Sequence, residues 1–150
     1  MHTERHQTPA TVDQVWAVIA DGWSYPCWVV GASRMRAVSG DWPAPGARLH
    51  HSVGAWPALL DDDTEVVECE PGRRILLRAK ARPFFGVAAV EITLEPQGGG
   101  TLISMREDAS QGPGRFVPQA ARQAAIARRN SETLTRLALI AEHATEPRRS

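Results

Sequence analysis

A histidine doublet, His50-His51, lies in a segment where apolar Leu49 and Val53 alternate with polar residues. Successive strand residues face opposite sides of a sheet, so the two imidazoles cannot bind one metal ion together. The alternation with Leu49 and Val53 places His51 on the inner side. A neutral imidazole inside a cavity can hydrogen-bond a ligand hydroxyl or move a proton. The alternative is a core histidine whose hydrogen bonds are satisfied by the protein.

Glu107 is the second candidate for acid–base chemistry. It shares one face of a predicted strand with Ile103 and Met105, which places its carboxylate near the mouth of a cavity. A carboxylate there can act as a general base, and we predict Glu107 and His51 as candidate catalytic residues. The alternative is a carboxylate that lies exposed at the rim or pairs with an arginine such as Arg106 or Arg115.

Asn130 interrupts an apolar stripe at helical spacing, between Ile126 and Leu134. A buried amide needs hydrogen-bond partners, which a ligand, a water molecule or a side chain from a sheet can supply. The alternative is that the stripe is rotated and Asn130 lies at its edge.

Other site chemistry is not indicated. Asp61-Asp62-Asp63 lacks the glycine and the distant glutamate of a calcium loop, so we predict a solvated turn or the face of an edge strand. The sequence has no GxSxG, P-loop, GxGxxG or HExxH pattern. We therefore expect no cofactor and no metal. Cys27 and Cys69 have no CxxC spacing and are predicted to be small buried side chains in a reducing cytoplasm.

Two helices are predicted from periodicity and capping. Thr11 to Gln14 fits a capping box, apolar residues follow at helical spacing, and Gly22 occupies the position of a terminating C′ glycine, so we predict a helix over residues 12–20. A short helical turn over 24–29 is a weaker prediction because Pro26 interrupts it. From Gln119 to about His143 strong helix formers dominate without Gly or Pro, which predicts a long C-terminal helix.

The residues between these helices alternate as strands do. The clearest pair is the run through Val90, Ile92 and Leu94, joined by Gly98-Gly99-Gly100 to Leu102–Met105, which predicts a hairpin. Short turns between successive strands favour an antiparallel meander. One long helix covers a curved sheet incompletely, so we expect an α+β fold of six or seven strands with a cavity between helix and sheet.

Several motifs resemble the START-like superfamily (SRPBCC, helix-grip proteins), and within it the polyketide cyclase/dehydrase branch. They are Pro9-Ala10-Thr11-Val12-Asp13-Gln14-Val15-Trp16, Asp21-Gly22-Trp23, Trp28-Val29-Val30-Gly31, Trp42-Pro43-Ala44-Pro45-Gly46, Glu70-Pro71-Gly72-Arg73-Arg74-Ile75, Met105-Arg106-Glu107-Asp108 and Arg129-Asn130-Ser131-Glu132-Thr133-Leu134. The resemblance covers roughly residues 8 to 143. It implies a deep apolar pocket gripped between a curved seven-stranded sheet and the C-terminal helix. Members bind lipids, hormones, quinones or polyketides, and some catalyse cyclisation.

In the resembled fold, the loops around the cavity entrance would carry the large aromatic side chains of this chain. Such rings suit an apolar ligand with a few polar groups, and the alternative is that they fill the core. The predicted ligand contacts are Trp28, Met35, His51, Trp56, Phe84, Phe85, Met105, Glu107 and Asn130.

Composition limits the function classes. The chain has 150 residues with 17 basic and 17 acidic side chains, which argues against a nucleic-acid partner, and no apolar run is long enough for a membrane span. The polar start predicts no secretory signal and hence a cytoplasmic protein. We expect one START-like domain over residues 1–144, a flexible tail over 145–150, and a monomer or homodimer.

These observations favour binding of a small hydrophobic ligand, polyketide-, quinone- or lipid-like. The alternatives are a cyclase/aromatase- or dehydratase-like enzyme, which would use Glu107 and His51 for proton transfer beside a carbonyl, and a protein-interaction module.

Overall fold

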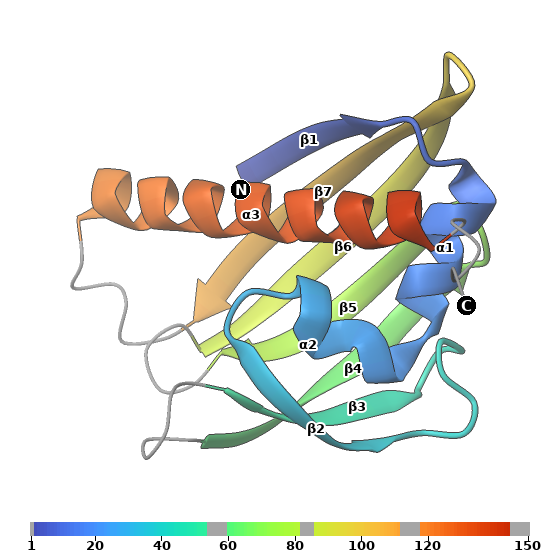
Figure 1. Ribbon diagram of the computed structural model, residues 1–150. Coiled ribbons are helices and arrows are strands. Elements are labelled where there is room, and N and C mark those ends of the chain that lie inside the picture. The colour runs from blue at the N-terminus through green and yellow to red at the C-terminus, as the bar shows by residue number, and fades with distance from the viewer. Residues whose placement is uncertain (1, 54–59, 82–85, 112–117, 145–150) are drawn as a thin grey trace.

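The computed structural model describes residues 2–53, 60–81, 86–111 and 118–144. It confirms the α+β helix-grip fold: a seven-stranded antiparallel sheet and a long C-terminal helix (Figure 1). The elements are β1 (His2–Thr8), α1 (Val12–Ala20), η1 (Gly22–Ser24), α2 (Tyr25–Trp28), β2 (Ala32–Val38), β3 (Arg48–Val53), β4 (Leu60–Glu70), β5 (Arg74–Ala81), β6 (Gly86–Gln97), β7 (Gly100–Gln111) and α3 (Gln119–His143).

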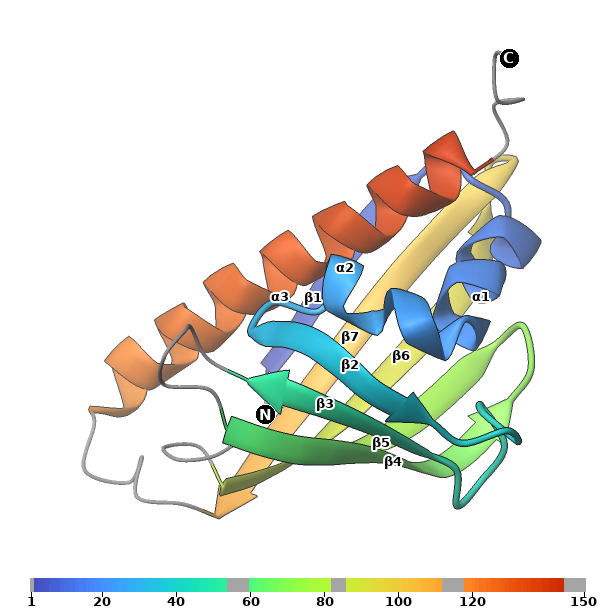
Figure 2. The ribbon, with the colours of Figure 1, turned by 60° about the horizontal axis from the view of Figure 1, so that its bottom comes forward.

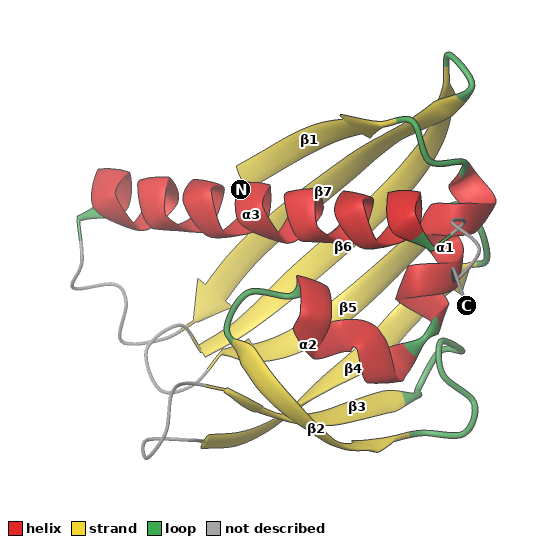
Figure 3. Ribbon diagram, viewed as in Figure 1, coloured by secondary structure: helices red, strands yellow, loops and turns green. Residues whose placement is uncertain are grey.

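The sheet has the strand order β1-β7-β6-β5-β4-β3-β2, so β2 to β7 form the predicted meander and β1 adds beside the last strand. The helices α1, α2 and α3 lie on one face of this sheet (Figure 3). The other face carries charged side chains, as the alternation predicts; Arg74, for example, donates to Glu91 at 2.7 Å and to Glu68 at 2.6 Å. The helix-covered face is therefore the apolar one.

The helix α1 begins with the predicted capping box, in which the Thr11 hydroxyl accepts from the Gln14 backbone and the Gln14 side chain accepts from the Thr11 backbone. The helix α1 ends before Gly22, as predicted, but Gly22 is not the C′ glycine with positive φ that the prediction assumed. Gly22 is buried and its φ is not positive. A Cβ there would lie 2.8 Å from the Leu49 and Val38 side chains, so the glycine is required by close packing.

The predicted hairpin connects β6 and β7 through Gly98 and Gly99, whose φ angles are +58° and +84°. Positive φ at both central residues is the type I′ geometry that matches the twist of the strands. Gly100, the first residue of β7, is the third glycine and has a different role. An added Cβ would lie 2.1 Å from the Thr8 carbonyl oxygen, so β1 approaches β7 closely at this point.

The helix α3 spans the predicted residues and crosses the helix-covered face near β1 and β7 (Figures 1 and 2). It packs against β1, α1, α2 and β7. The predicted stripe is buried, and Asn130 belongs to it with no exposed surface. Near its C-terminal end, Glu142 accepts a hydrogen bond of 2.6 Å from the Thr8 hydroxyl, which ties the helix to the edge strand.

Some local expectations were wrong. Cys27 is exposed and Cys69 is half-buried, because α2 is short and turns Cys27 toward solvent. Asp62 is buried, since β4 is an interior strand and its even positions Asp62, Thr64 and Val66 face inward. Pro26 does not interrupt the turn after α1 but occupies the first turn of α2, where its missing N–H costs nothing.

Within the described residues, no helix combines the length and the apolar character that a membrane crossing requires. The predicted tail over 145–150 lies outside the described residues.

Gly100→Ala should destabilise the protein, because the new methyl group meets the Thr8 backbone rather than a movable side chain. We expect a loss of about 1–3 kcal/mol in the free energy of unfolding, measured by urea denaturation. Gly40→Ala is the matched control, because nothing lies within 4 Å of a Cβ at that position. Equal stability of the two variants would contradict this account of β1 packing.

Candidate functional site

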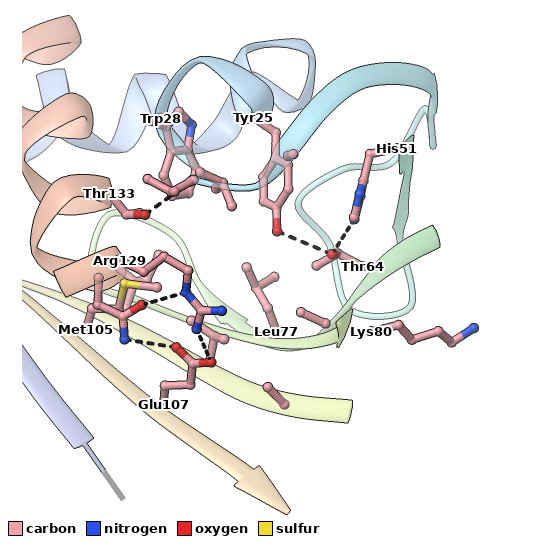
Figure 4. Close-up of a pocket in the computed structure, with 18 residues that line it drawn as sticks. Tyr25, Trp28, His51, Thr64, Leu77, Lys80, Met105, Glu107, Arg129 and Thr133 are labelled. Carbon is pink, nitrogen blue, oxygen red and sulfur yellow. Dashed lines mark hydrogen bonds and ion pairs between the residues drawn. The ribbon is translucent and has the colours of Figure 1, made fainter. Parts of the chain in front are cut away.

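A cavity of about 100 Å³ lies between α2, α3 and the inner face of the sheet (Figure 4). Each of the strands β2 to β7 contributes to its wall. Pockets for drug-sized ligands measure roughly 300–1,000 Å³, and a cavity of roughly 150 Å³ accepts benzene. The space in this conformation is smaller than both, so the side chains around it must move to admit a whole ring.

The wall of the cavity is mainly apolar because the inward positions of successive strands carry apolar residues. Leu77 comes from β5, Val90 and Ile92 from β6, and Met105 from β7. Ala79 and Ala88 form a cross-strand pair, and their short side chains leave space between the sheet and the helices. The cavity thus exists where the sheet carries small residues opposite the helix layer.

Glu107 lies at one end of the cavity, where α3 meets β7. Its carboxylate accepts a hydrogen bond from the Arg129 guanidinium and another, of 2.9 Å, from the Asn130 side-chain amide (Figure 4). Glu107 is only 5% exposed and Asn130 is fully buried, so each supplies the partner that the other's burial requires. Arg129 is partly exposed and places its charge at the rim. We call these residues, Glu107, Arg129 and Asn130, the α3 clamp.

His51 lies at the other end of the cavity, on β3. Its Nε2 is 2.9 Å from the Thr64 hydroxyl on β4, which is 3.3 Å from the Tyr25 hydroxyl on α2 (Figure 4). The Tyr25 and His51 rings also pack together, with centroids 5.4 Å apart. Burial lowers the pKa of His51 and raises the pKa of Tyr25, so both side chains are neutral near pH 7. We call Tyr25, Thr64 and His51 the polar trio.

Two buried nitrogen atoms on cavity-lining residues have no hydrogen-bond partner among the described residues: Nδ1 of His51 and Nε1 of Trp28. Trp28 packs edge-on against Tyr25, with ring centroids 5.5 Å apart. A buried N–H without an acceptor is destabilising, and such groups in native proteins usually mark an absent partner.

The predicted site residues fall into distinct groups. Trp28, His51, Met105, Glu107 and Asn130 all line the cavity. The predicted strand and helix periodicity gave the inward direction of His51, Met105, Glu107 and Asn130. Trp28 was instead expected at the cavity entrance from the resembled fold. For Glu107, the pairing alternative is the one observed, with Arg129 in place of Arg106 or Arg115.

Met35 does not line the cavity; it is half-buried and packs against the core. Two bulges in β2 break its alternation, so that Ala32 is the β2 residue at the cavity wall. Trp56, Phe84 and Phe85 lie outside the described residues.

Sequence reasoning missed Thr64, Arg129 and Thr133 as cavity residues, and Tyr25 was among the aromatic residues expected near the entrance but not among the predicted ligand contacts. Thr64 could have been found, because it shares the alternating inner face of β4 with Val66. Thr133 lies three residues after Asn130, on the same helical face, and its hydroxyl accepts from the Val30 backbone at 3.2 Å. Arg129 gave no such signal, because its partner is distant in the sequence.

Lys80 is a second cation at the cavity wall, but it is not directed into the cavity. Its ammonium lies 2.5 Å from Asp63, and Figure 4 shows the side chain extending away from the other residues. This hydrogen bond lowers the pKa of Asp63. Among the described residues, no group of three or more His, Cys, Asp and Glu side chains is placed to hold a metal ion.

Solved structures with the same fold include a protein from Nitrosomonas europaea, with a TM-score of 0.73 and 17% identity over 95% of this chain and 94% of that one. The di-domain ARO/CYC StfQ from the steffimycin biosynthetic pathway has a TM-score of 0.72 and 13% identity over 95% of this chain. DynU16, a protein in the dynemicin biosynthetic locus, has a TM-score of 0.68 and 24% identity over 95% of this chain. This chain covers 50% of StfQ and 47% of DynU16.

No curated protein matches the sequence. The family model described as polyketide cyclase / dehydrase and lipid transport matches residues 2–142, which includes the α3 clamp, the polar trio and all the strands. The long helix over a seven-stranded sheet, the cavity between them and this match agree with one another. The chain belongs to the polyketide cyclase/dehydrase and lipid transport family.

Proposed function

We propose that this protein binds a small hydrophobic or aromatic ligand in the cavity beneath α3. The carrying observation is the cavity itself, which has an apolar wall and a polar group at each end. A few fixed polar groups in an apolar pocket are the usual composition of a small-molecule site. The apolar wall supplies affinity, and the polar ends orient the ligand.

The proposed ligand is polyketide-, quinone- or lipid-like. The family description names polyketides and lipids, and two proteins of the same fold come from biosynthetic pathways or loci. The volume of about 100 Å³ adds that the side chains around the cavity must move to admit a whole ring of the ligand.

A second candidate is catalysis of a cyclisation or dehydration. It is favoured by one observation, the placement of a carboxylate and an imidazole on the same cavity wall. Proton transfer beside a carbonyl requires such a group within reach of the substrate. Both Glu107 oxygens, however, already accept hydrogen bonds from the other two residues of the α3 clamp, Arg129 and Asn130. Holding the helix is therefore the role that the geometry supports better for Glu107.

The neutral state of His51 is part of this proposal, since a charged imidazole in an apolar wall would oppose an apolar ligand. Burial is the main cause of its lowered pKa. Among its charged neighbours, Asp62 and Asp63 oppose this shift, whereas Arg36 and His50 reinforce it. The unfolded chain has an ordinary histidine pKa of about 6.5 and so takes up the proton first.

Filling the cavity should abolish binding. Ala88→Leu extends a buried side chain into the space, so we expect saturable binding of a single-ring probe, acetophenone, to be lost in a nitrogen-15 NMR titration. Ala89→Leu is the matched control, because Ala89 is the next residue of β6 and is exposed on the opposite face. Retained binding in the Ala88→Leu variant, with an intact fold, would contradict the proposed site.

The α3 clamp should contribute to stability. Glu107→Gln replaces two acceptor oxygens by one, so either Arg129 or Asn130 loses its acceptor, and we expect a loss of about 1–3 kcal/mol. Glu132→Gln removes an exposed ion pair with Arg136 on the same helix and should change stability by less than about 0.5 kcal/mol. Urea denaturation measures both. If the Glu107→Gln variant is as stable as the original protein, the two hydrogen bonds do not hold the helix. The Glu107 carboxylate of the original protein is then the better candidate for proton transfer.

Stability should fall as the pH is lowered from about 6.5 toward 5, because the unfolded state then binds more protons than the folded state. Replacing His51 by Gln should flatten this part of the profile, whereas His50→Gln, which changes the half-buried neighbour, should preserve it. Denaturation midpoints at several pH values give the comparison. A profile unaffected by His51→Gln would show that His51 is not buried in its neutral form.

A further inference from the structure

The polar trio holds more hydrogen-bond donors than its contacts use. The Tyr25 hydroxyl, the Thr64 hydroxyl and the neutral His51 ring each carry one polar hydrogen atom. Within the part of the chain that the structure describes, the hydrogen bonds of the trio are one between Tyr25 and Thr64 and one between Thr64 and His51. Each of these two hydrogen bonds uses one of the three hydrogen atoms. Whichever way the bonds run, one hydrogen atom therefore has no acceptor within the trio.

The chemistry of the groups decides which donor remains. The phenol of Tyr25 is the most acidic donor of the three, and an unprotonated imidazole nitrogen is the most basic acceptor. Hydrogen bonds aligned in one direction also strengthen one another. The favoured direction therefore runs from Tyr25 through Thr64 to Nε2 of His51, and the ring hydrogen is then on Nδ1.

Nδ1 is buried and has no partner among the described residues, so a hydrogen atom on it is left for a ligand to accept. The lowered pKa of His51 also keeps a single hydrogen on the ring. Tyr25 and Thr64 are thus positioning residues, since they set which nitrogen of His51 donates.

We infer that His51 Nδ1–H is a ligand-binding donor, fixed by Tyr25 and Thr64, which selects ligands with a ketone- or quinone-type oxygen over plain hydrocarbon rings or chains. This inference rests on the proposed function and specifies its ligand class. A carbonyl oxygen supplies the acceptor that Nδ1 lacks, without bringing a charge into the apolar wall.

Trp28 supports the same ligand class independently. Its indole N–H is a donor only, it is buried on the same cavity wall, and it has no acceptor among the described residues. A hydrocarbon ligand would leave both donors unpaired, whereas a ligand with acceptor oxygens, such as a quinone or diketone, can pair them.

The test compares acetophenone with α-methylstyrene, which have the same shape and differ by C=O against C=CH₂. One hydrogen bond of about 1 kcal/mol predicts that the ketone binds about five-fold more tightly, measured by NMR titration. In protein with nitrogen-15 histidine, we expect the hydrogen on Nδ1, and its signal should shift with the ketone and not with the alkene.

Variants assign the effect to particular donors. Thr64→Val should remove the preference for hydrogen on Nδ1 and reduce the ratio of the two affinities, and Thr64→Ser should restore both. Trp28→Phe should reduce the ratio too, whereas Trp23→Phe, at a position that is 60% exposed, should not.

Equal affinities for the two compounds, or a ring hydrogen found on Nε2, would overturn the inference and leave the proposed function standing. A ratio unchanged by both Thr64→Val and Trp28→Phe would also overturn it. If neither compound binds, the proposed function itself fails.

Discussion

The buried carboxylate of Glu107 is the constraint on which the cavity depends. A carboxylate that is 5% exposed is stable only with charged or hydrogen-bonded partners, and both of its partners come from α3. These bonds connect α3 to β7 at Arg129 and Asn130. Beside the cavity, α3 therefore meets β7 through hydrogen-bonded polar side chains and not through apolar packing.

The two halves of α3 consequently meet the sheet in different ways. Toward its C-terminal end, Leu134, Leu137 and Ala141 are fully buried and belong to the continuous core with α1. Around Arg129 and Asn130 the contacts are polar, and the opposing sheet carries Ala79 and Ala88. Dense packing at one end provides the stability that permits incomplete packing at the other.

Sequence patterns predicted the features that depend on residues close together in the chain. The capping box of α1, the glycine hairpin and the stripe of α3 depend on neighbouring residues, and the structure has all of them as expected. Met35 was misplaced because two bulges in β2 shift its register, which alternation cannot reveal. Arg129 was missed because its bond to Glu107 spans 22 residues of sequence and depends on how the helix crosses the sheet. The inward direction of a residue was therefore predictable, whereas its partner was not.

The fold and the polar groups in the cavity carry different kinds of information. Proteins with 13% to 24% identity share this frame, so the frame is compatible with many sets of inward side chains. Under the proposed function, ligand selection then comes from the polar atoms that the fold leaves without a partner. The Glu107 carboxylate accepts from both Arg129 and Asn130, whereas Nε1 of Trp28 and Nδ1 of His51 have no partner among the residues described. Under the proposed function, this difference puts the polar contact of the ligand at the α2 end of the cavity.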